Sequence, residues 1–462
     1  MNFNELFGSV PDGWRSCTLG ELVKEFGGGI QTGPFGSQLH AADYVENGIP
    51  SIMPKNIRID GVDDSDIARV SLEDIERLSK YKVQTGDIVY SRRGDVEKCS
   101  LITELEDGWL CGTGCLRVRL QSKQISPEFL HAYLCHPYVR EWIVRHAVGA
   151  TMPNLNTSIL SALPVLVPTS GAMNSITSNW SALSQKLVVN VKINQTLEQM
   201  AQAIFKSWFV DFDPVKAKMN SEQPEGMDAA TASLFPEKLV ESELGLIPDG
   251  WEVSSLGEHL DILETGKRPK GGVKGITEGV PSVGAENILG VGKYNYGKEK
   301  FIPDELFNKL KKGVIESEDV LIYKDGGKPG DFKPRFSMFG YGFPYEKFAI
   351  NEHVFRIRSE RLGQAYLYCQ MQEPCVFNDL RNKGAKAAIP GINQKDVNSL
   401  LLVIPSDALL KEFNNLTSSI FKKILKNSLQ SLELSRLRDT LLPKLLSGEI
   451  NLDTTEELVE VN

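Results

Sequence analysis

Long hydrophobic runs are missing from this sequence. No stretch approaches the ~18 uninterrupted apolar residues that a membrane-spanning helix needs. The segment from Met1 to Phe7 contains neither a basic region nor an apolar run, so it does not resemble a secretory signal. Cysteine is also sparse, and seven cysteines scattered over 462 residues favour reduced thiols over a disulfide framework. We therefore expect a cytoplasmic protein that has no membrane partner.

Catalytic motifs are missing as well. The sequence contains no phosphate-binding loop of the G-x-x-x-x-G-K-[ST] type and no G-x-G-x-x-G after a strand. It contains no G-x-S-x-G or H-E-x-x-H motif either. A Pro-Pro pair does not occur, which excludes the Asp/Asn-Pro-Pro-aromatic site of an amino-methyltransferase. We therefore expect no catalytic residue in this chain.

The net charge of −9 would by itself argue against a nucleic-acid partner. The acidic residues are unevenly placed, however. Residues 211–245 and 449–462 each carry a net charge of −5, so the rest of the chain is close to neutral. The overall acidity therefore excludes no class of partner.

The chain repeats itself with an offset of 237 residues. Pro11-Asp12-Gly13-Trp14 recurs as Pro248-Asp249-Gly250-Trp251, and Met152-Pro153-Asn154-Leu155-Asn156 recurs as Ile389-Pro390-Gly391-Ile392-Asn393. The sequence between these motifs matches only loosely. An equal offset at both ends indicates two copies of one fold whose middle parts have diverged.

A long helix is predicted after each copy. Apolar residues recur at alternating steps of three and four from Met173 to Trp208, as in the seam of a coiled coil. These 36 residues would form a helix of ~54 Å. The second seam, from Leu410 to Leu445, is apolar at nearly the same places, and Pro443 and Gly448 should end its helix. The alternative is that each helix only covers its own domain with an apolar stripe.

Both seams are polar at the same two central places, which are Asn190 and Asn194 in the first helix and Asn427 and Ser431 in the second. Polar groups in a seam cost stability but fix the register and the partner. If the helices pair antiparallel, these four side chains should meet and satisfy one another.

These observations predict a fold of the α/β (mixed α+β) class with an internal pseudo-two-fold repeat. Two similar globular domains would be separated by two long helices that form an antiparallel coiled coil. The expected segments are a first domain at 1–168, a helix at 169–210, an acidic linker at 211–245, a second domain at 246–405, a helix at 406–447 and an acidic tail at 448–462.

Two possible ligand sites are weak. Cys111, Cys115, His131 and Cys135 have spacings that could hold zinc, but the second copy has no corresponding cysteines, so we expect no metal and treat these thiols as core residues. The glycine-rich run from Gly27 to Gly36 could form an anion-binding nest, although a tight loop is the commoner structure for such a run.

Basic residues in the divergent middle parts are the candidate DNA contacts, because arginine recognises guanine edges and lysine contacts phosphates. Loops at equivalent places in both copies carry such residues, although any single one could be an ordinary solvated side chain. The candidates are Lys55, Arg58, Arg92 and Arg93 in the first copy, and Lys267, Arg268, Lys270, Lys324 and Lys328 in the second.

The pattern resembles the specificity subunit of type I restriction–modification systems over essentially the whole chain. The resemblance rests on the repeated Pro-Asp-Gly-Trp motif and on four further segments, which are Gln31 to Ser37, Gly86 to Asp95, Asn194 to Phe209 and Leu437 to Gly448. The second copy departs from the pattern because it has Lys324-Asp325 where the first has Arg92-Arg93, so base contacts cannot be transferred between the copies.

The resemblance implies a non-catalytic subunit that binds double-stranded DNA, each domain reading one half of a split, asymmetric target. The helices would dock two methyltransferase subunits and, through them, two restriction subunits. S-adenosylmethionine, ATP and Mg²⁺ would then bind to the partners and not to this chain. Two rival functions are a duplicated protein-binding scaffold and a stand-alone restriction enzyme.

Overall fold

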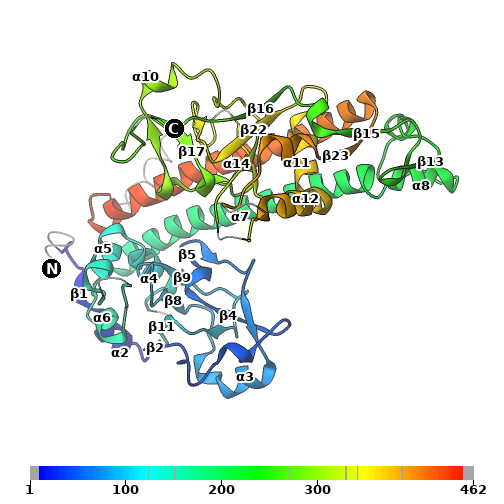
Figure 1. Ribbon diagram of the computed structural model, residues 1–462. Coiled ribbons are helices and arrows are strands. Elements are labelled where there is room, and N and C mark those ends of the chain that lie inside the picture. The colour runs from blue at the N-terminus through cyan, green and yellow to red at the C-terminus, as the bar shows by residue number, and fades with distance from the viewer. Residues whose placement is uncertain are drawn as a thin grey trace, which may run out of the picture. The chain divides into compact units, whose positions relative to one another are not determined.

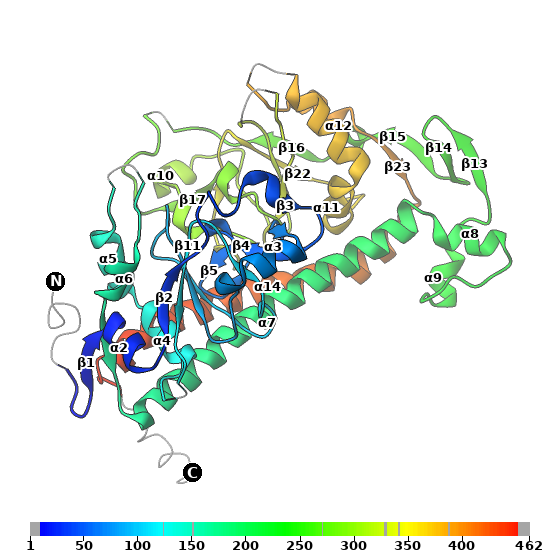
Figure 2. The ribbon, with the colours of Figure 1, turned by 90° about the horizontal axis from the view of Figure 1, so that it is seen from below.

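The computed structural model describes residues 10–122, 124–149, 152–269, 271–327, 330–340, 342–386 and 389–450. They form two compact units, which Figures 1 and 2 show from two directions. The first unit comprises residues up to 188 together with those from 433 onward, and the second comprises residues 189–432. Each unit therefore contains one globular copy and parts of both long helices, and each is described by itself.

The first unit is built on two four-stranded sheets. The main sheet is antiparallel and has the order β2-β11-β8-β9. The second sheet has the order β10-β4-β7-β3. Helices α4 and α5 pack on the main sheet, and β1 pairs with β12. The bounds are β1 (Arg15–Thr18), α2 (Leu19–Glu25), β2 (Gly29–Thr32), β3 (Tyr44–Val45), β4 (Ile49–Ile52), β5 (Ile57–Arg58), β6 (Gly61–Val62), β7 (Ala68–Val70), α3 (Leu72–Arg77), β8 (Ile88–Ser91), β9 (Cys99–Leu101), β10 (Leu110–Cys111), β11 (Cys115–Arg119), α4 (Pro127–Leu134), α5 (Pro137–His146), α6 (Thr157–Ser161) and β12 (Pro164–Val167).

The second unit repeats this topology. Its main sheet has the order β16-β22-β19-β20, β15 pairs with β23, and β17 pairs in parallel with β21 as β4 does with β10. The bounds are β15 (Glu252–Ser255), β16 (Ile262–Thr265), β17 (Val280–Val283), β18 (Phe301–Ile302), α10 (Asp304–Phe307), β19 (Val320–Tyr323), β20 (Phe336–Met338), β21 (Ala349–Ile350), β22 (Val354–Arg358), α11 (Gln364–Gln372), α12 (Pro374–Ala385), α13 (Gln394–Asn398) and β23 (Leu401–Ile404). The fold is thus mixed α/β and internally duplicated.

The repeated Pro-Asp-Gly-Trp motif forms the same turn in both units. The backbone N–H of Trp14 donates to the carbonyl of Pro11, and that of Trp251 donates to Pro248, both at 3.1 Å. The third residue of each turn is a glycine with a positive φ, 77° at Gly13 and 79° at Gly250, which a side chain would disfavour. The motif is therefore repeated because the backbone needs it.

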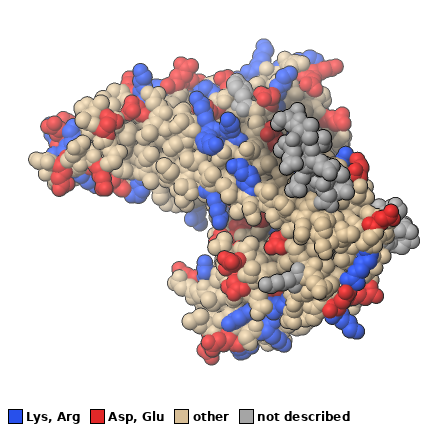
Figure 3. Space-filling model, turned by 180° about the vertical axis from the view of Figure 1, so that it is seen from behind, with Lys and Arg blue, Asp and Glu red and all other residues tan. Residues whose placement is uncertain are grey.

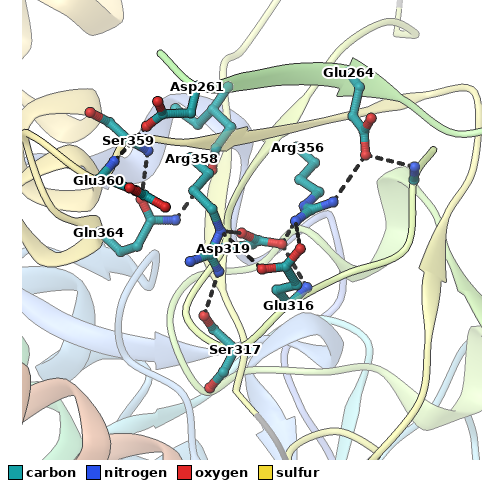
Figure 4. A network of polar contacts seen from close by, with 12 residues as sticks. Asp261, Glu264, Glu316, Ser317, Asp319, Arg356, Arg358, Ser359, Glu360 and Gln364 are labelled. Atoms are coloured by element: carbon teal, nitrogen blue, oxygen red, sulfur yellow. Dashed lines mark hydrogen bonds and ion pairs between the residues drawn. The ribbon is translucent and has the colours of Figure 1, made fainter. Parts of the chain in front are cut away.

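A buried carboxylate holds the centre of each main sheet. In the second unit, Arg356 and Arg358 of β22 converge on Asp319, whose side chain is fully buried (Figure 4). Arg356 also pairs with Glu264 at 3.0 Å and Glu316 at 2.8 Å. In the first unit, Arg119 of β11 donates two hydrogen bonds to the buried Asp87, at 2.7 and 2.6 Å. These paired charges fix the strand that leads into each candidate DNA-contact loop.

Helices α7 (Ser170–Phe209) and α14 (Asp407–Leu446) lie side by side and antiparallel within each unit (Figures 1 and 2). In the first unit, the guanidinium of Arg438 lies 4.9 Å from the ring centre of Trp180. In the second, Asn194 is hydrogen-bonded to Asn427. Pro443 does not end α14 as expected, because the helix continues to Leu446; it ends before Gly448, whose φ is 73°. Among the described residues, no helix is both long and apolar enough to cross a membrane.

The segment expected as an acidic linker, 211–245, is folded. It contains α8 (Asp213–Met219), α9 (Ala229–Ser233) and β13 (Leu239–Ser242), which pairs with β14 (Gly245–Pro248). Phe212, Val215 and Phe235 are buried in the core of the second unit. The expectation of a linker was wrong because it rested on the net charge of this segment. Whether a segment packs depends on the apolar residues that it can bury.

Replacing Asp319 with Ala should destabilise the second unit by ~2–4 kcal/mol, because the buried Arg356 and the partly buried Arg358 would lose the carboxylate that they share, although Glu316 and Glu264 remain nearby. Native-state hydrogen exchange of the β19 and β22 amides measures this loss. Asp331→Ala, at an exposed position of the same unit, is the control and should change stability by less than ~0.5 kcal/mol. Equal exchange protection in the two variants would contradict the assigned role of Asp319.

Candidate nucleic-acid interface

The loop after β8 is held by the repeated segment that contains Asn154. The backbone N–H of Leu155 donates to the carbonyl of Arg92 at 2.9 Å, and that of Gly94 donates to Pro153 at 3.3 Å. Arg92 also donates its own N–H to Gly114 at 2.8 Å. These bonds fix the backbone of Arg92 and Arg93, so only their side chains are left to adapt to a ligand.

The two arginines differ in their surroundings. The Nε of Arg92 donates to the side-chain oxygen of Asn154 at 3.3 Å, and its guanidinium lies 5.8 Å from the ring centre of Phe35. Phe35 is 52% exposed. Arg93 is exposed, and its guanidinium has no hydrogen-bond or ion-pair partner within the described part of the chain. An aromatic ring, a positioned arginine and a free arginine could contact phosphates and base edges.

The second unit holds the equivalent loop with the same bonds. Ile392 donates to the carbonyl of Lys324 at 2.8 Å, and Gly326 donates to Pro390 at 2.9 Å. Lys324 therefore occupies the place of Arg92, and Asp325 occupies that of Arg93. The backbone frame is repeated, while the second of the two side chains has changed from a base to an acid.

Lys324 is tied down by its neighbours. Its ammonium donates to Asp325 at 2.9 Å and to the carbonyl of Glu352 at 3.2 Å. Burial of the Asp325 carboxyl acts to raise its pKa. Hydrogen bonds from Lys324 and His353 outweigh burial and hold that pKa below its usual range. Lys324 thus neutralises a local carboxylate that is also hydrogen-bonded to His353, and the Lys324 ammonium is already engaged by this unit.

The remaining candidates are surface residues. Lys55 pairs with Asp66 at 2.7 Å and Arg58 pairs with Asp63 at 3.1 Å. Arg268 lies 3.7 Å from Glu352 and is largely exposed, as is Lys267. Exposed pairs of this kind contribute little to stability, so a phosphate can replace the acidic partner at low cost. Lys270 and Lys328 lie outside the described residues.

Charge is mixed on the surface that Figure 3 shows, where Lys and Arg side chains alternate with Asp and Glu. No continuous basic face covers that view.

The glycine-rich run is not an anion-binding nest. The N–H of Gly28 donates to the carbonyl of Val23 at 2.8 Å, that of Gly27 donates to Lys24, and Gly29 already begins β2. The run ends α2 and starts a strand, which occupies the amides that an anion would need.

The four residues weighed as a zinc set are divided between two places. Cys111 and Cys115 pack in one apolar cluster, where burial raises the pKa of Cys111 to about 12. Cys135 lies in another cluster, together with Cys99, which the sequence analysis did not consider. Hydrogen bonding to the Cys135 thiol lowers the pKa of Cys99, although burial opposes this shift.

Comparison with known proteins agrees with this architecture. Residues 11–199 match the family model of the type I restriction modification DNA specificity domain. The chain is 26% identical over 440 residues to the type I restriction enzyme HindI specificity subunit of Haemophilus influenzae, covering 82% of this chain and 90% of that protein. The chain is thus similar to specificity subunits of type I restriction–modification systems, and residues 11–199 carry the family-model match.

Two further similarities extend over most of the chain. It is 24% identical over 332 residues to the MjaIX specificity subunit of Methanocaldococcus jannaschii, covering 71% of this chain and 70% of that protein. The crystal structure of a type I restriction-modification S subunit from M. genitalium has a TM-score of 0.51 at 14% identity, covering 96% of this chain and 98% of that chain. The second similarity shows a shared fold.

Three residues at or near these loops were not singled out from the sequence. Phe35 and Asn154 lie in motifs that the sequence analysis noted only for their repetition or resemblance. Arg335 precedes β20, and its guanidinium lies 4.3 Å from the ring centre of Tyr323. Only strand pairing brings Arg335 next to Tyr323, so no spacing in the sequence could have shown it.

The central polar residues of the two long helices meet in the structure. The side-chain nitrogen of Asn427 donates to the oxygen of Asn194 at 2.9 Å, and that of Asn190 donates to Ser431 at 3.2 Å. Asn190 is 1% exposed and Asn427 is 3% exposed. A slip in register would leave these amides buried without partners, so the hydrogen bonds select one pairing.

Replacing Asn427 with Ala removes the donor to Asn194 and leaves a half-buried carbonyl oxygen unpaired. We expect a loss of ~1–3 kcal/mol in the free energy of unfolding, measured by urea denaturation of the full chain. Asn415→Ala changes an exposed residue of the same helix and is the matched control. Equal unfolding midpoints for the two variants would show that the amide cluster does not stabilise the helix pair.

Proposed function

We propose that this chain is a specificity subunit of a type I restriction–modification system, which reads a bipartite, asymmetric DNA sequence with one globular copy per half-site and performs no chemistry itself. The observation that carries the proposal is the repeated loop after β8 and β19. The same backbone bonds hold both loops, while Arg92 and Arg93 are replaced by Lys324 and Asp325. A constant frame with different side chains is what two readers of different base sequences need.

The first reader would be residues 1–168 and the second residues 246–405. In the first, we assign base or phosphate contacts to Arg92 and Arg93, with Lys55 and Arg58 as outer contacts. In the second, we assign them to Lys267, Arg268 and Arg335, and we give Lys324 the positioning of the loop. Exposed lysines and arginines supply the sequence-independent part of the affinity.

The helices at 169–210 and 406–447 would dock two methyltransferase subunits, and through them two restriction subunits. Apolar side chains remain exposed on α7, with Val189 at 45%, Ile193 at 37% and Met200 at 49%. Exposed apolar residues that recur along one helix face suit a protein partner better than DNA. S-adenosylmethionine, ATP and Mg²⁺ would be bound by those partners.

Replacing Arg93 with Ala should cost ~1–3 kcal/mol at one base position of a single half-site, because one guanidinium contact is lost. Methylation profiling of the source genome supplies the target, and fluorescence anisotropy of the assembled complex on duplexes with one altered base pair measures the loss. Arg145→Ala, on the surface of α5, is the control. The assignment is wrong if Arg92→Ala/Arg93→Ala binds both half-sites with unchanged affinity and specificity.

In the second unit, Arg335→Ala should weaken binding to the other half-site about tenfold or more, by a loss of the same size. Lys324→Ala should weaken it less, because the ammonium is already bonded within the protein. The same anisotropy series compares the two variants. A larger loss of DNA affinity for Lys324→Ala than for Arg335→Ala would assign the DNA contact to Lys324 instead.

A further inference from the structure

A compact sulfur–nitrogen cluster lies in the core of the first unit, apart from the candidate DNA contacts. Cys99 belongs to β9. His131 lies on α4, and Cys135 follows one turn later at the C-terminal end of that helix. The two Sγ atoms are 3.8 Å apart, and the Sγ of Cys135 lies 3.4 Å from the Nε2 of His131. The exposed fractions are 1% for Cys99, 4% for His131 and 6% for Cys135.

These two distances are close to those expected between ligand atoms around a tetrahedral zinc ion. Zinc binds thiolate sulfur at about 2.3 Å and imidazole nitrogen at about 2.0–2.1 Å, nearly always in tetrahedral geometry. Two sulfurs on such an ion are about 3.8 Å apart, and a sulfur and a nitrogen are about 3.6 Å apart. All three ligand atoms lie within 4.8 Å of one another, so they could share one ion with small adjustments.

A second observation points to the same place. Tyr90 of β8 is paired directly opposite Cys99 of β9 and is fully buried. Its hydroxyl interacts with the Cys99 thiol, but within the described residues it forms no hydrogen bond of good geometry. A buried hydroxyl without a well-formed hydrogen bond is costly, and a bound ion or its water would relieve that cost.

The equivalent positions of the second unit carry other residue types. The strand and helix registers place Ile322, Phe336, Tyr368 and Gln372 where the first unit has Tyr90, Cys99, His131 and Cys135. Phe336 packs in the apolar core, and the hydroxyl of Tyr368 donates to Glu198 at 2.8 Å. The shared fold therefore does not need these ligand types, and their convergence is peculiar to the first unit.

We propose that Cys99, His131 and Cys135 hold one Zn²⁺ ion in the core of the first unit, with the fourth position on the side of Tyr90. Binding would release the two thiol protons and leave two thiolates and a neutral imidazole on the metal. The ion would tie α4 to β9, the neighbour of β8, and β8 is the strand that comes directly before Arg92. The proposal does not depend on DNA binding.

Metal analysis of the full chain, purified under reducing conditions without chelator, tests the site. We expect about one zinc per chain, and Cys99→Ser and Cys135→Ser should each reduce it to background. Cys111→Ser is the matched control, because Cys111 is equally buried but packs in a separate cluster, and it should keep its zinc. A chelator should lower the Tm of the wild type and of Cys111→Ser only.

Replacing the zinc with Co²⁺ gives a readout that does not depend on the folding of any variant. Two thiolates on a tetrahedral Co²⁺ should give sulfur-to-metal charge-transfer bands and intense visible bands in the wild-type chain. Absence of zinc together with absence of these bands would overturn the proposal and leave a hydrogen-bonded pair of reduced thiols. Zinc that persists in both Cys99→Ser and Cys135→Ser would also overturn it, by placing the metal elsewhere.

Discussion

The antiparallel pairing of α7 with α14 is the constraint on which both units depend. Leu442, Leu445 and Leu446 of α14 are buried in the core of the first unit, beside Met173 and Ile176 of α7. In the second unit, Ala201, Phe205 and Trp208 of α7 are buried together with Leu410 and Phe413 of α14. The helix that follows each copy thus completes the core of the other copy, so neither copy buries its apolar surface alone.

The pairing of the two helices is packed differently in the two units. Arg438 covers the ring of Trp180 in the first unit, while Ala201 and Thr417 occupy the equivalent places in the second. The charge of Arg438 is neutralised by Asp60 and Asp439. The central amides then fix the register between these two kinds of packing.

Within each globular copy, a rigid frame carries a variable loop. Asp87 with Arg119, and Asp319 with Arg356 and Arg358, fix adjacent strands of each main sheet. The segments around Asn154 and Gly391 then hold the loops after β8 and β19 with matching backbone bonds. Because the frame uses backbone groups and buried charges, the side chains at the positions of Arg93 and Asp325 could diverge without loss of the fold.

The sequence by itself determined the duplication, the two long helices, the strands before Arg92 and Lys324, and the central polar positions. Those features follow from local periodicity and from repetition at one offset, which need no tertiary contact. Only the tertiary structure decided that residues 211–245 fold, that α14 continues past Pro443, and that Lys324 is engaged by Asp325. It also brought Cys99 to Cys135, and Arg335 to Tyr323. Strand pairing and core packing join residues that are distant in the chain, and no spacing along the sequence records such contacts.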